Sequence, residues 1–378
     1  MKLYPLKFEP ILKSKVWGGN KIPAFKSFDY SGEPIGESWE LSAFPGDESV
    51  VAEGELKGMN ILELIDAFGV DLLGTKAYAA SLTPRGAVQG VDAPRNVSVA
   101  TPGAQTTEDR GRTALTPYLA GRPLSSGGRA AFPLLFKFID AGDDLSVQVH
   151  PDDALAQSKG YPYGKTEMWY VIDADPGAKL FSGFCKETAP EEFRGLALDG
   201  GIMDRLGSYD VHPGDVFFLP AGRVHAIGKG CFVAEIQQSS DSTYRIYDYN
   251  RLGLDGRPRA LHIDSALQAT DFTIVENAKS HPDVPLNTLT PLVHCDYFKV
   301  SVLRANAWVA VPCKAGESFT VLMCTEGSAE IEAGIPDGGP TKGHRVAMRR
   351  GETVLIPASA TTIKVLPSPE ATLLVVTQ

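Results

Sequence analysis

Two side chains that can bind a metal ion stand two positions apart in the segment LSVQVHPDD, residues 145–153. The alternating apolar residues predict a short β-strand, and side chains two apart on a strand point to the same face. Gln148 and His150 therefore share one face, which is either a polar edge of the strand or one side of a metal site. This segment alone does not decide between the two, so the choice depends on ligands from other segments.

A histidine follows a Gly-x5-Pro-x-Gly pattern in GDVFFLPAGRVHAI, residues 214–227. Gly214 and the segment 220–222 predict two turns with a strand between them, and His225 begins the next strand. The pattern resembles the second signature of the cupin superfamily, whose small jelly-roll barrels hold a metal on inward-facing strand residues. The first cupin signature supplies two histidines and a glutamate.

The resemblance implies a ligand set in which a glutamine replaces the first histidine of the family. Two neutral imidazoles and one carboxylate leave a divalent ion with net positive charge, so that it acts as a Lewis acid, and the glutamine amide is a weak neutral fourth ligand. This set favours one zinc ion (Zn2+) per chain, and its imidazoles and carboxylate also suit Fe(II) or Mn(II). The implied metal ligands are Gln148, His150, Glu167 and His225.

A second copy of the turn pattern lies near the C-terminus in GETVLIPASATTIKV, residues 351–365, with Thr362 in the place of the histidine. Upstream, MCTEGSAEIE (323–332) predicts a strand, a turn and a strand. We therefore expect a mainly β protein made of two cupin-like jelly-roll β-barrels with a few short helices. The expected division is a metal-binding barrel over 1–270 and a ligand-less barrel over 271–378.

Two helices and one insertion are expected outside the strands. NILELIDAFGVDLLG (60–74) predicts a helix with Asn60 as N-cap, Glu63 completing a capping box and a stop near Gly69. TAPEEFRGLAL (188–198) predicts a helix capped by Thr188, with a proline in the first turn. The segment at about 80–131 is rich in Ala, Gly, Arg, Thr and Pro, which predicts a poorly ordered surface insertion.

Composition excludes several classes of protein. A formal net charge of −10 argues against nucleic-acid binding, which needs clustered Lys and Arg. No run approaches the roughly 18 apolar residues of a membrane span, and the first residues, MKLYPLKFEPILKSKVW, lack the apolar core of a signal peptide. The five scattered cysteines form no Cys-x-x-Cys motif, which favours a reducing compartment and a cytoplasmic protein. The oligomeric state is not predicted.

Six motifs, taken in order, resemble those of type I mannose-6-phosphate isomerases in their short bacterial form. The resemblance covers nearly the whole chain except about 80–131, for which no family counterpart is expected. It implies a zinc enzyme that interconverts D-mannose 6-phosphate and D-fructose 6-phosphate, a small sugar phosphate substrate, through a cis-enediol. The motifs are KVWGG, GESWELS, FPLLFKFIDAGDDLSVQVHPDD, GKTEMWYV, PAGRVHAI and EIQQSSDSTYRIYDYNR.

The resemblance also implies which residues carry out proton transfer. Arg245 matches an active-site arginine and could stabilise negative charge on the enediolate oxygen. Glu235 is a candidate base, and pairing with a nearby cation is an equally good explanation of it. Lys165 stands two residues before Glu167 and could move protons or anchor phosphate.

Further residues are implied to contact the substrate. Lys137 and Ser146 match family positions near the phosphate, and Asp241 could orient Arg245 or a sugar hydroxyl. Trp17 matches a cleft tryptophan that could cover a sugar face, or it packs between the barrels. The remaining histidines are expected at the surface or in packing: His212, His262, His281, His294 and His344.

Two other functions fit a cupin fold. A metal dioxygenase would need Fe(II) and an open triad of ligands, and the glutamine at position 148 and the Lys165–Glu167 spacing argue against it. A non-catalytic sugar-binding cupin would keep the barrel but would need neither Arg245 nor a charged proton carrier. Activity on mannose 6-phosphate separates these classes.

Overall fold

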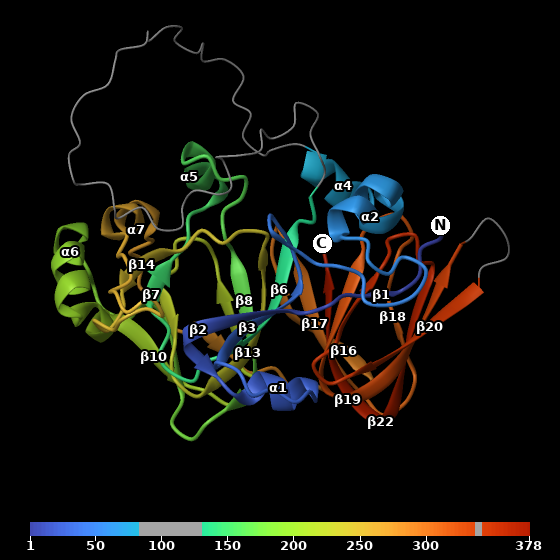
Figure 1. Cartoon of the computed structure of the whole chain (residues 1–378). Helices are drawn as coiled ribbons and strands as arrows, with labels where there is room; N and C mark the ends of the chain where they lie inside the picture. The colour runs from blue at the N-terminus through green and yellow to red at the C-terminus, as the bar shows by residue number, and fades with distance from the viewer. Residues whose placement is uncertain (83–130, 337–341) are drawn as a thin grey trace, which may run out of the picture.

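The computed structural model describes residues 1–82, 131–336 and 342–378. Most of the expected insertion at about 80–131 lies outside the described residues. Figure 1 shows two β-rich parts side by side, with short helices on their outer surfaces and the C-terminal strands in orange and red. The predicted mainly β fold is confirmed, while the jelly-roll form of each part stays a prediction.

The first part is built from a seven-stranded and a five-stranded sheet that contribute side chains to one shared interior. Both sheets are antiparallel along the pairs that carry the site, so short turns join neighbouring strands. The seven-stranded sheet has the order β15 (Lys279–Ser280), β11 (Val216–Leu219), β8 (Glu167–Ala174), β13 (Cys231–Gln238), β6 (Leu134–Asp140), β3 (Ile35–Leu41) and β2 (Ile11–Gly19). The five-stranded sheet has the order β10 (Leu206–Asp210), β9 (Lys179–Phe184), β12 (His225–Ile227), β7 (Val147–Val149) and β14 (Tyr244–Tyr247); β4 (Ala43–Phe44) pairs with β5 (Asp47–Glu48).

The second part is one eight-stranded sheet dominated by two long strands. The expected strand–turn–strand over 323–332 is wrong, because β19 runs unbroken through it. Gly327 takes a positive φ of 71° at a register shift, so it forms a bulge that bends the strand rather than a turn that ends it. The strands are β1 (Leu6–Lys7), β21 (Thr353–Ile356), β19 (Thr320–Ile335), β22 (Thr362–Thr377), β17 (Lys299–Ala305), β16 (Thr288–His294), β18 (Val309–Val311) and β20 (Lys342–Arg349).

Turn glycines confirm the repeated sequence pattern in both parts. Gly214 and Gly222 have φ of 92° and 90°, on either side of β11, and Gly351 has φ of 83° before β21. These values lie in the left-handed region that glycine adopts without a steric penalty. His225 therefore begins β12 after the second turn, whereas Thr362 begins β22 in the second part.

The predicted helix after Asn60 is confirmed, including its start and its stop. The Asn60 side chain accepts hydrogen bonds from the backbone N–H groups of Leu62 and Glu63, and Glu63 accepts from the Asn60 backbone N–H. Ile61, Leu64 and Ile65 are buried on its inner face, which is the apolar spacing seen in the sequence. Gly69 ends the helix with a positive φ.

Thr188 is not the cap of the next predicted helix. The N-cap residue is Ala189, which makes no side-chain capping bond, and Pro190 is the first helical residue. The Thr188 hydroxyl instead donates to the carbonyl of Lys186, so it closes a local turn. The helices are α1 (Lys21–Lys26), α2 (Ile61–Phe68), α3 (Val70–Leu73), α4 (Thr75–Leu82), α5 (Asp153–Ser158), α6 (Pro190–Asp199), α7 (Ile263–Ala269) and the 3-10 helix η1 (Gly201–Arg205).

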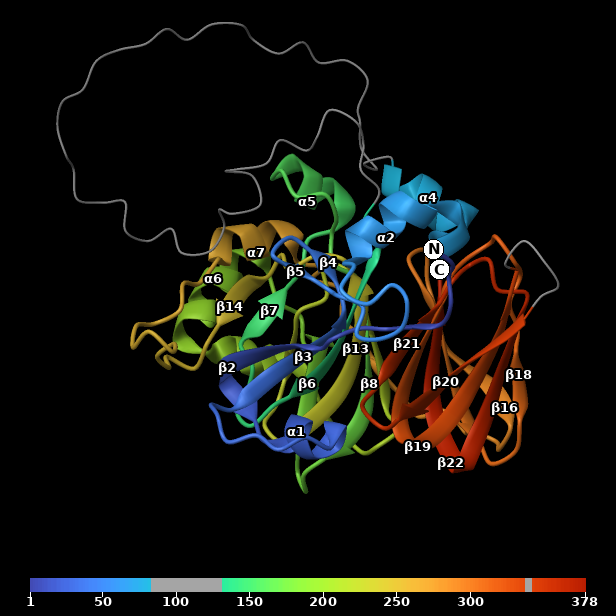
Figure 2. The same cartoon turned by 45° about the vertical axis from the view of Figure 1, so that its right-hand side comes forward.

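Two strands cross the expected boundary at residue 270. β15 pairs with β11 of the first part, and β1 pairs with β21 of the second part. Lys26 of α1 also joins the parts, because its ammonium contacts Glu40 at 2.8 Å and the carbonyl of Gly351. Figure 2 shows α1 at the base, beside the sheets of the first part and near β19. The division at 270 stays a proposal.

Over the described ranges, no helix combines the length and apolarity that crossing a membrane requires.

Replacing Asn60 with Ala tests whether the capping box holds α2. The change should lower the free energy of unfolding by about 1 kcal/mol, because two backbone N–H groups lose their acceptor. Denaturant unfolding would measure it. Asn60→Asp should keep nearly all the stability, and equal losses for both variants would show that the cap does not contribute.

Candidate metal centre and substrate cavity

Strands from both sheets of the first part bring the predicted ligands together. His225 on β12 is the direct cross-strand partner of Gln148 on β7 in the five-stranded sheet. Glu167 begins β8 in the seven-stranded sheet, and His150 follows β7 directly. The ligand atoms of His150, Glu167 and His225 all lie within 4.8 Å of one another, so this group could hold a metal ion.

Backbone carbonyls orient both imidazoles. The Nδ1 atom of His150 is 2.8 Å from the carbonyl oxygen of Ser242, and the Nδ1 atom of His225 is 2.8 Å from that of Arg223. A carbonyl only accepts, so each Nδ1 carries the proton and each Nε2 presents a lone pair. A hydrogen bond of this kind typically fixes the tautomer of a metal-binding histidine.

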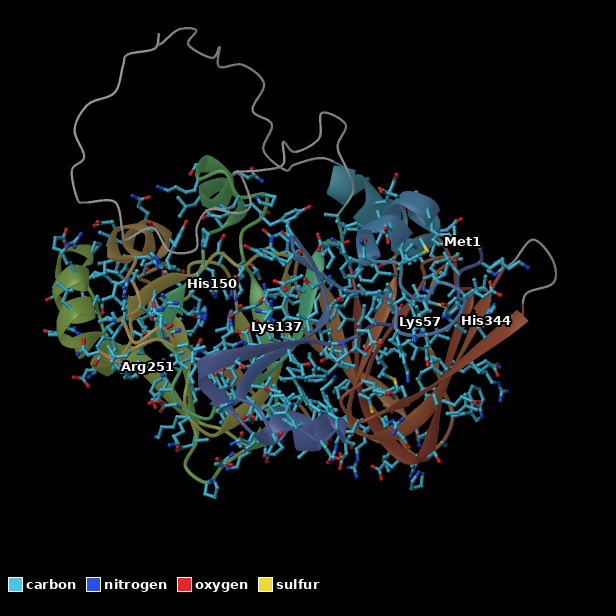
Figure 3. The ribbon with its side chains drawn as sticks, in the orientation of Figure 1. Met1, Lys57, Lys137, His150, Arg251 and His344 are labelled. Carbon is cyan, nitrogen blue, oxygen red and sulfur yellow. The ribbon has the colours of Figure 1, made fainter. Side chains whose placement is uncertain are left out.

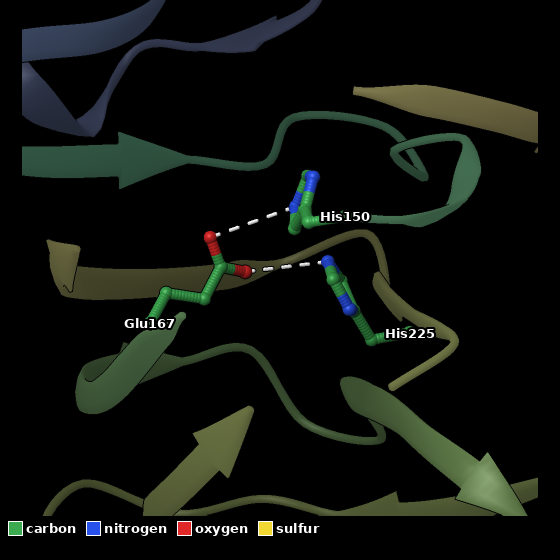
Figure 4. A group of neighbouring side chains, drawn as sticks. All are labelled: His150, Glu167 and His225. Carbon is green, nitrogen blue, oxygen red and sulfur yellow. Dashed lines mark ion pairs between the residues drawn. The ribbon is translucent and has the colours of Figure 1, made fainter. Parts of the chain in front are cut away.

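The carboxylate of Glu167 faces both lone pairs. Its Oε1 lies 3.2 Å from Nε2 of His225, and its Oε2 lies 3.6 Å from Nε2 of His150 (Figure 4). With the protons on Nδ1, neither contact has a hydrogen between its two atoms. The ammonium of Lys165 lies beside Oε2 and beside Nε2 of His150. Oε1 is buried and has no hydrogen-bond donor in the described part of the chain. A cation bound among these three groups would satisfy all of them, so the residues fit a metal.

Burial keeps the imidazoles in the neutral form that binds metals. It lowers the pKa of His225 to about 3, with help from the charge of Lys165, and it lowers the pKa of His150 well below the ordinary value. Burial also raises the pKa of Glu167 to about 7, reinforced by the negative charge of Glu235. The carboxylate of Glu167 is therefore an ion that the interior accepts only with a positive partner.

Gln148 lies at the edge of this group. Its Nε2 atom is 3.3 Å from Nε2 of His225. The oxygen and nitrogen of an amide have nearly the same shape, so turning the amide by half a revolution would place Oε1 in the same position. Gln148 can therefore supply the neutral oxygen that the sequence suggested.

A cavity of about 540 Å³ opens beside the metal-ligand group. His150, Glu167 and His225 lie behind its wall, where they are almost wholly buried. Figure 3 labels Lys137 and His150 within the first part and His344 on the second. The other predicted site residues all line this cavity: Trp17, Lys137, Ser146, Gln148, Lys165, Glu235, Asp241 and Arg245.

Both carboxylate oxygens of Glu235 are occupied. Lys137 Nζ lies 3.0 Å from Oε1, and Trp169 Nε1 donates to Oε2 at 2.9 Å. Lys137 on β6 and Trp169 on β8 are the direct cross-strand neighbours of Glu235, so sheet register makes these contacts. Burial opposes ionisation, yet Lys137 and Lys165 lower the pKa of Glu235 below its ordinary value. The expected alternative, that Glu235 pairs with a cation, is thus seen directly.

Lys137 carries a charge that carboxylates already balance. Burial disfavours its ammonium, but Glu235 and Glu37 raise the pKa of Lys137 above its ordinary value. Its Nζ also lies 5.2 Å from the centre of the Trp39 ring, a cation–π contact.

Lys165 is the cation closest to the metal-ligand group. Its ammonium lies against Oε2 of Glu167 and 3.0 Å from Nε2 of His150. It is almost fully buried, yet it lines the cavity, so it stands between the ligands and the space for a substrate.

Arg245 and Asp241 occupy another stretch of the cavity wall. Arg245 is the cross-strand partner of Gln148, but its Nη1 donates to the carbonyl of Ala260 rather than to a metal-ligand side chain. Among the described residues, no hydrogen bond joins Asp241 to Arg245. Their charges still interact at a distance. Burial lowers the pKa of Arg245, and the negative charge of Asp241 partly opposes this by raising it.

Trp17 and Ser146 are buried residues that also reach the cavity. Trp17 packs with Ile139, Leu145 and Trp169 in the interior of the first part, so it does not lie between the two parts. Ser146 precedes Gln148 by two positions and lines the same cavity, as alternation along the strand predicts.

The cavity-lining residues that sequence reasoning missed include Glu37, Arg259 and His262. His262 was expected at the surface or in packing; it lines the cavity, and its Nδ1 accepts the backbone N–H of Arg245 at 3.2 Å. Glu37 stands two residues before Trp39 in GESWELS, so the two share one face of the strand. This spacing was the sequence signal that could have identified Glu37. No local signal marked Arg259 or His262, because the chain folds back after β14 to place them.

A larger cavity of about 670 Å³ lies between the two parts. It is lined by residues such as Phe25, Tyr170 and Arg350 and contains none of the predicted site residues. We therefore place the candidate site in the smaller cavity, beside the metal-ligand group.

Comparisons with a family model, with curated sequences and with solved structures all point to the same enzyme family. The family described as phosphomannose isomerase type I, catalytic domain, matches residues 111–177, so the match begins inside the segment at about 80–131 for which no counterpart was expected. The mannose-6-phosphate isomerase of Streptococcus mutans serotype c (strain ATCC 700610 / UA159) is 32% identical over 93% of this chain and 92% of its own length. The mannose-6-phosphate isomerase ManA of Bacillus subtilis (strain 168) is 30% identical over 88% of this chain and 89% of its own. The crystal structure of the mannose 6-phosphate isomerase from Bacillus subtilis matches with a TM-score of 0.72 and 27% identity, covering 98% and 99% of the two chains.

Loss of either imidazole should remove the metal. We expect His150→Ala and His225→Ala to lower metal affinity at least about tenfold, because even loss of an outer hydrogen bond to a ligand has an effect of that order. Elemental analysis after dialysis against a fixed low zinc concentration would measure it. His294→Ala, which changes an exposed histidine of the second part, is the control. Retention of full metal content by both cavity variants would contradict the site.

Proposed function

Because this chain belongs to the type I mannose-6-phosphate isomerase family, we propose that it interconverts D-mannose 6-phosphate and D-fructose 6-phosphate. The observation that carries the proposal is the metal-ligand group placed against a cavity that five cations line. A sugar phosphate needs both features, since the carbonyl end must be polarised and the phosphate end must meet positive charge.

We propose that the metal is zinc and that Gln148, His150, Glu167 and His225 hold it. Two imidazoles, one carboxylate and a neutral amide oxygen suit this ion. When bound, zinc acts as a Lewis acid toward the substrate carbonyl. The Nδ1 hydrogen bonds of the two histidines support the proposal, because they preset the direction of both ligand lone pairs.

Lys165 is the proposed proton carrier. In the reaction the C2–H bond of the aldose breaks, its proton passes to a base, and C1 of the cis-enediol receives a proton while the O2 proton moves to O1. The amine of Lys165 faces the cavity beside the ligands, whereas both oxygens of Glu235 are held by Lys137 and Trp169. Glu235 then holds Lys137 and the cavity wall in place.

A coupled assay on mannose 6-phosphate, with and without chelator, tests the function. Metal-dependent formation of fructose 6-phosphate is expected. Oxygen consumption without isomerisation would indicate a dioxygenase instead. Binding of the sugar phosphate with no turnover at any metal concentration would indicate a non-catalytic sugar-binding protein.

We also propose a cellular compartment for the protein. Work in a reducing compartment such as the cytoplasm is supported by the five cysteines, all of which are free.

Two substitutions of Lys165 separate proton transfer from simple charge. If Lys165 carries the proton, Lys165→Met and Lys165→Arg should both lower kcat by about 10²- to 10⁴-fold, because arginine stays protonated in proteins. Metal content, measured on the same samples, should be retained. Recovery of wild-type kcat by Lys165→Arg would show that only a positive charge is needed, and Glu235→Gln would then be the next candidate to measure.

A further inference from the structure

Among the described residues, one cation of the cavity wall lacks an ion-pair partner. Lys15 pairs with Glu37 at 3.2 Å, Lys137 with Glu235 at 3.0 Å, Lys165 with Glu167, and Arg259 donates to Asp248 at 2.7 Å. These and Arg245 are the Lys and Arg residues that line the cavity. In the described part of the chain, no carboxylate forms an ion pair with Arg245.

The guanidinium of Arg245 is also incompletely hydrogen-bonded. Its Nε is buried and has no acceptor among the described residues, and the acceptor of its Nη1 is the neutral carbonyl of Ala260. A buried donor without an acceptor is costly and calls for an explanation. Burial lowers the pKa of Arg245 to about 10, and the charge of Arg259 acts in the same direction. The charges of Asp248 and Asp241 act in the opposite direction, but neither residue forms an ion pair with Arg245, so the guanidinium keeps an unused donor.

His262 adds a neutral donor at the same place. Its Nδ1 accepts the backbone N–H of Arg245 at 3.2 Å, so the proton of the neutral ring is on Nε2. Burial lowers the pKa of His262, and the neighbouring charge of Arg245 lowers it further. His262 lines the cavity, so it can donate a hydrogen bond to a bound anion without adding charge.

We propose that Arg245 and His262 bind the 6-phosphate group of the sugar. This assignment of the phosphate to Arg245 and His262 rests on the proposed function. It identifies the part of the site that binds the charged end of the substrate. Arginine suits the role, because its planar donors match phosphate oxygens in pairs. Arg245 and Gln148 are cross-strand partners, so one substrate molecule can extend along the cavity from the metal ligands to the guanidinium.

The Lys137 end of the cavity is a poorer place for a dianion. Two carboxylates, Glu235 and Glu37, act on the ammonium of Lys137, and a phosphate there would meet their repulsion. Asp241 and Asp255 also line the cavity, but neither forms an ion pair with Arg245. Arg245 is therefore assigned to binding the phosphate. The sequence had suggested that it stabilises the enediolate oxygen.

Inhibition by inorganic phosphate tests the assignment on the metal-loaded protein. Arg245→Met should raise both KM for mannose 6-phosphate and the inhibition constant of phosphate by about 10- to 100-fold, the range of a hydrogen bond to a charged group. Arg304→Met removes one exposed arginine of the second part, which pairs with Glu370 at 2.6 Å, and should leave both constants unchanged. Metal content and melting temperature, measured for every variant, show whether a variant has lost its metal or its fold.

Two substitutions at His262 provide a matched pair. His262→Asn keeps an acceptor near the position of Nδ1 and removes the cavity-facing donor, so both constants should rise by about 2- to 10-fold. His262→Gln keeps a donor near the position of Nε2 and should stay closer to wild type. Equal effects of the two changes would mean that His262 only supports the backbone of Arg245.

Two results would overturn the assignment. If Arg245→Met lowers kcat while KM and phosphate inhibition stay the same, Arg245 acts on the enediolate. If phosphate inhibition is instead lost in Lys137→Met, the anchor lies at Lys137. If the wild-type protein does not isomerise mannose 6-phosphate, the proposed function fails, and calorimetric titration of inorganic phosphate into wild type and Arg245→Met still decides where the anion binds.

Discussion

The metal-ligand group depends on two hydrogen bonds between imidazoles and backbone carbonyls. The carbonyls of Ser242 and Arg223 hold the Nδ1 protons of His150 and His225, which leaves two lone pairs aimed at one carboxylate. Both carbonyls lie outside the strands, that of Arg223 at the end of the turn before β12 and that of Ser242 in the segment between β13 and β14, so these connections determine ligand direction. Gly222 is part of the turn before β12, where its φ of 90° would strain any other residue and a Cβ would lie 3.1 Å from the carbonyl oxygen of Ala269.

Buried charge is the second constraint, because an ion in a protein interior is stable only beside an opposite charge. Trp39, Lys137, Glu235 and Trp169 lie in one row across β3, β6, β13 and β8, each facing the next. A shift of one residue in β6 or β13 would turn a charged side chain out of the row and leave its partner buried alone. Sheet register and charge pairing thus support each other, and Arg245 is the position where the pairing stops.

The second part supports the site without contributing a ligand. Strand β8 shows how: Glu167 and Trp169 point into the first part, while Met168 and Tyr170 pack in the apolar core that continues into the second part. Side chains alternate along a strand, so one face holds the metal ligand and the other is fixed by packing. Lys26 strengthens the same junction through Glu40 and Gly351. A ligand strand anchored on its back face can hold its carboxylate in one direction.

The sequence by itself determined the type of each local feature, because turns, caps and alternation depend on neighbouring residues. The glycine turns around β11, the capping box at Asn60 and the shared face of Gln148 and Ser146 were all readable in this way. The order of the motifs was enough to indicate the family and the metal-ligand group. Local reading failed where a longer pairing overruled it, as in β19, where β22 keeps the chain extended through Gly327.

Only the tertiary structure decided how the charges are shared. Sequence placed Lys137, Glu235 and Arg245 in one site but could not show that the first two balance each other, because their contact depends on the register of strands about a hundred residues apart. It also could not bring His262 beside Arg245, since the fold-back of the chain after β14 places it there. Residue identity fixes which chemistry is available, and long-range packing fixes which group remains free to carry it out.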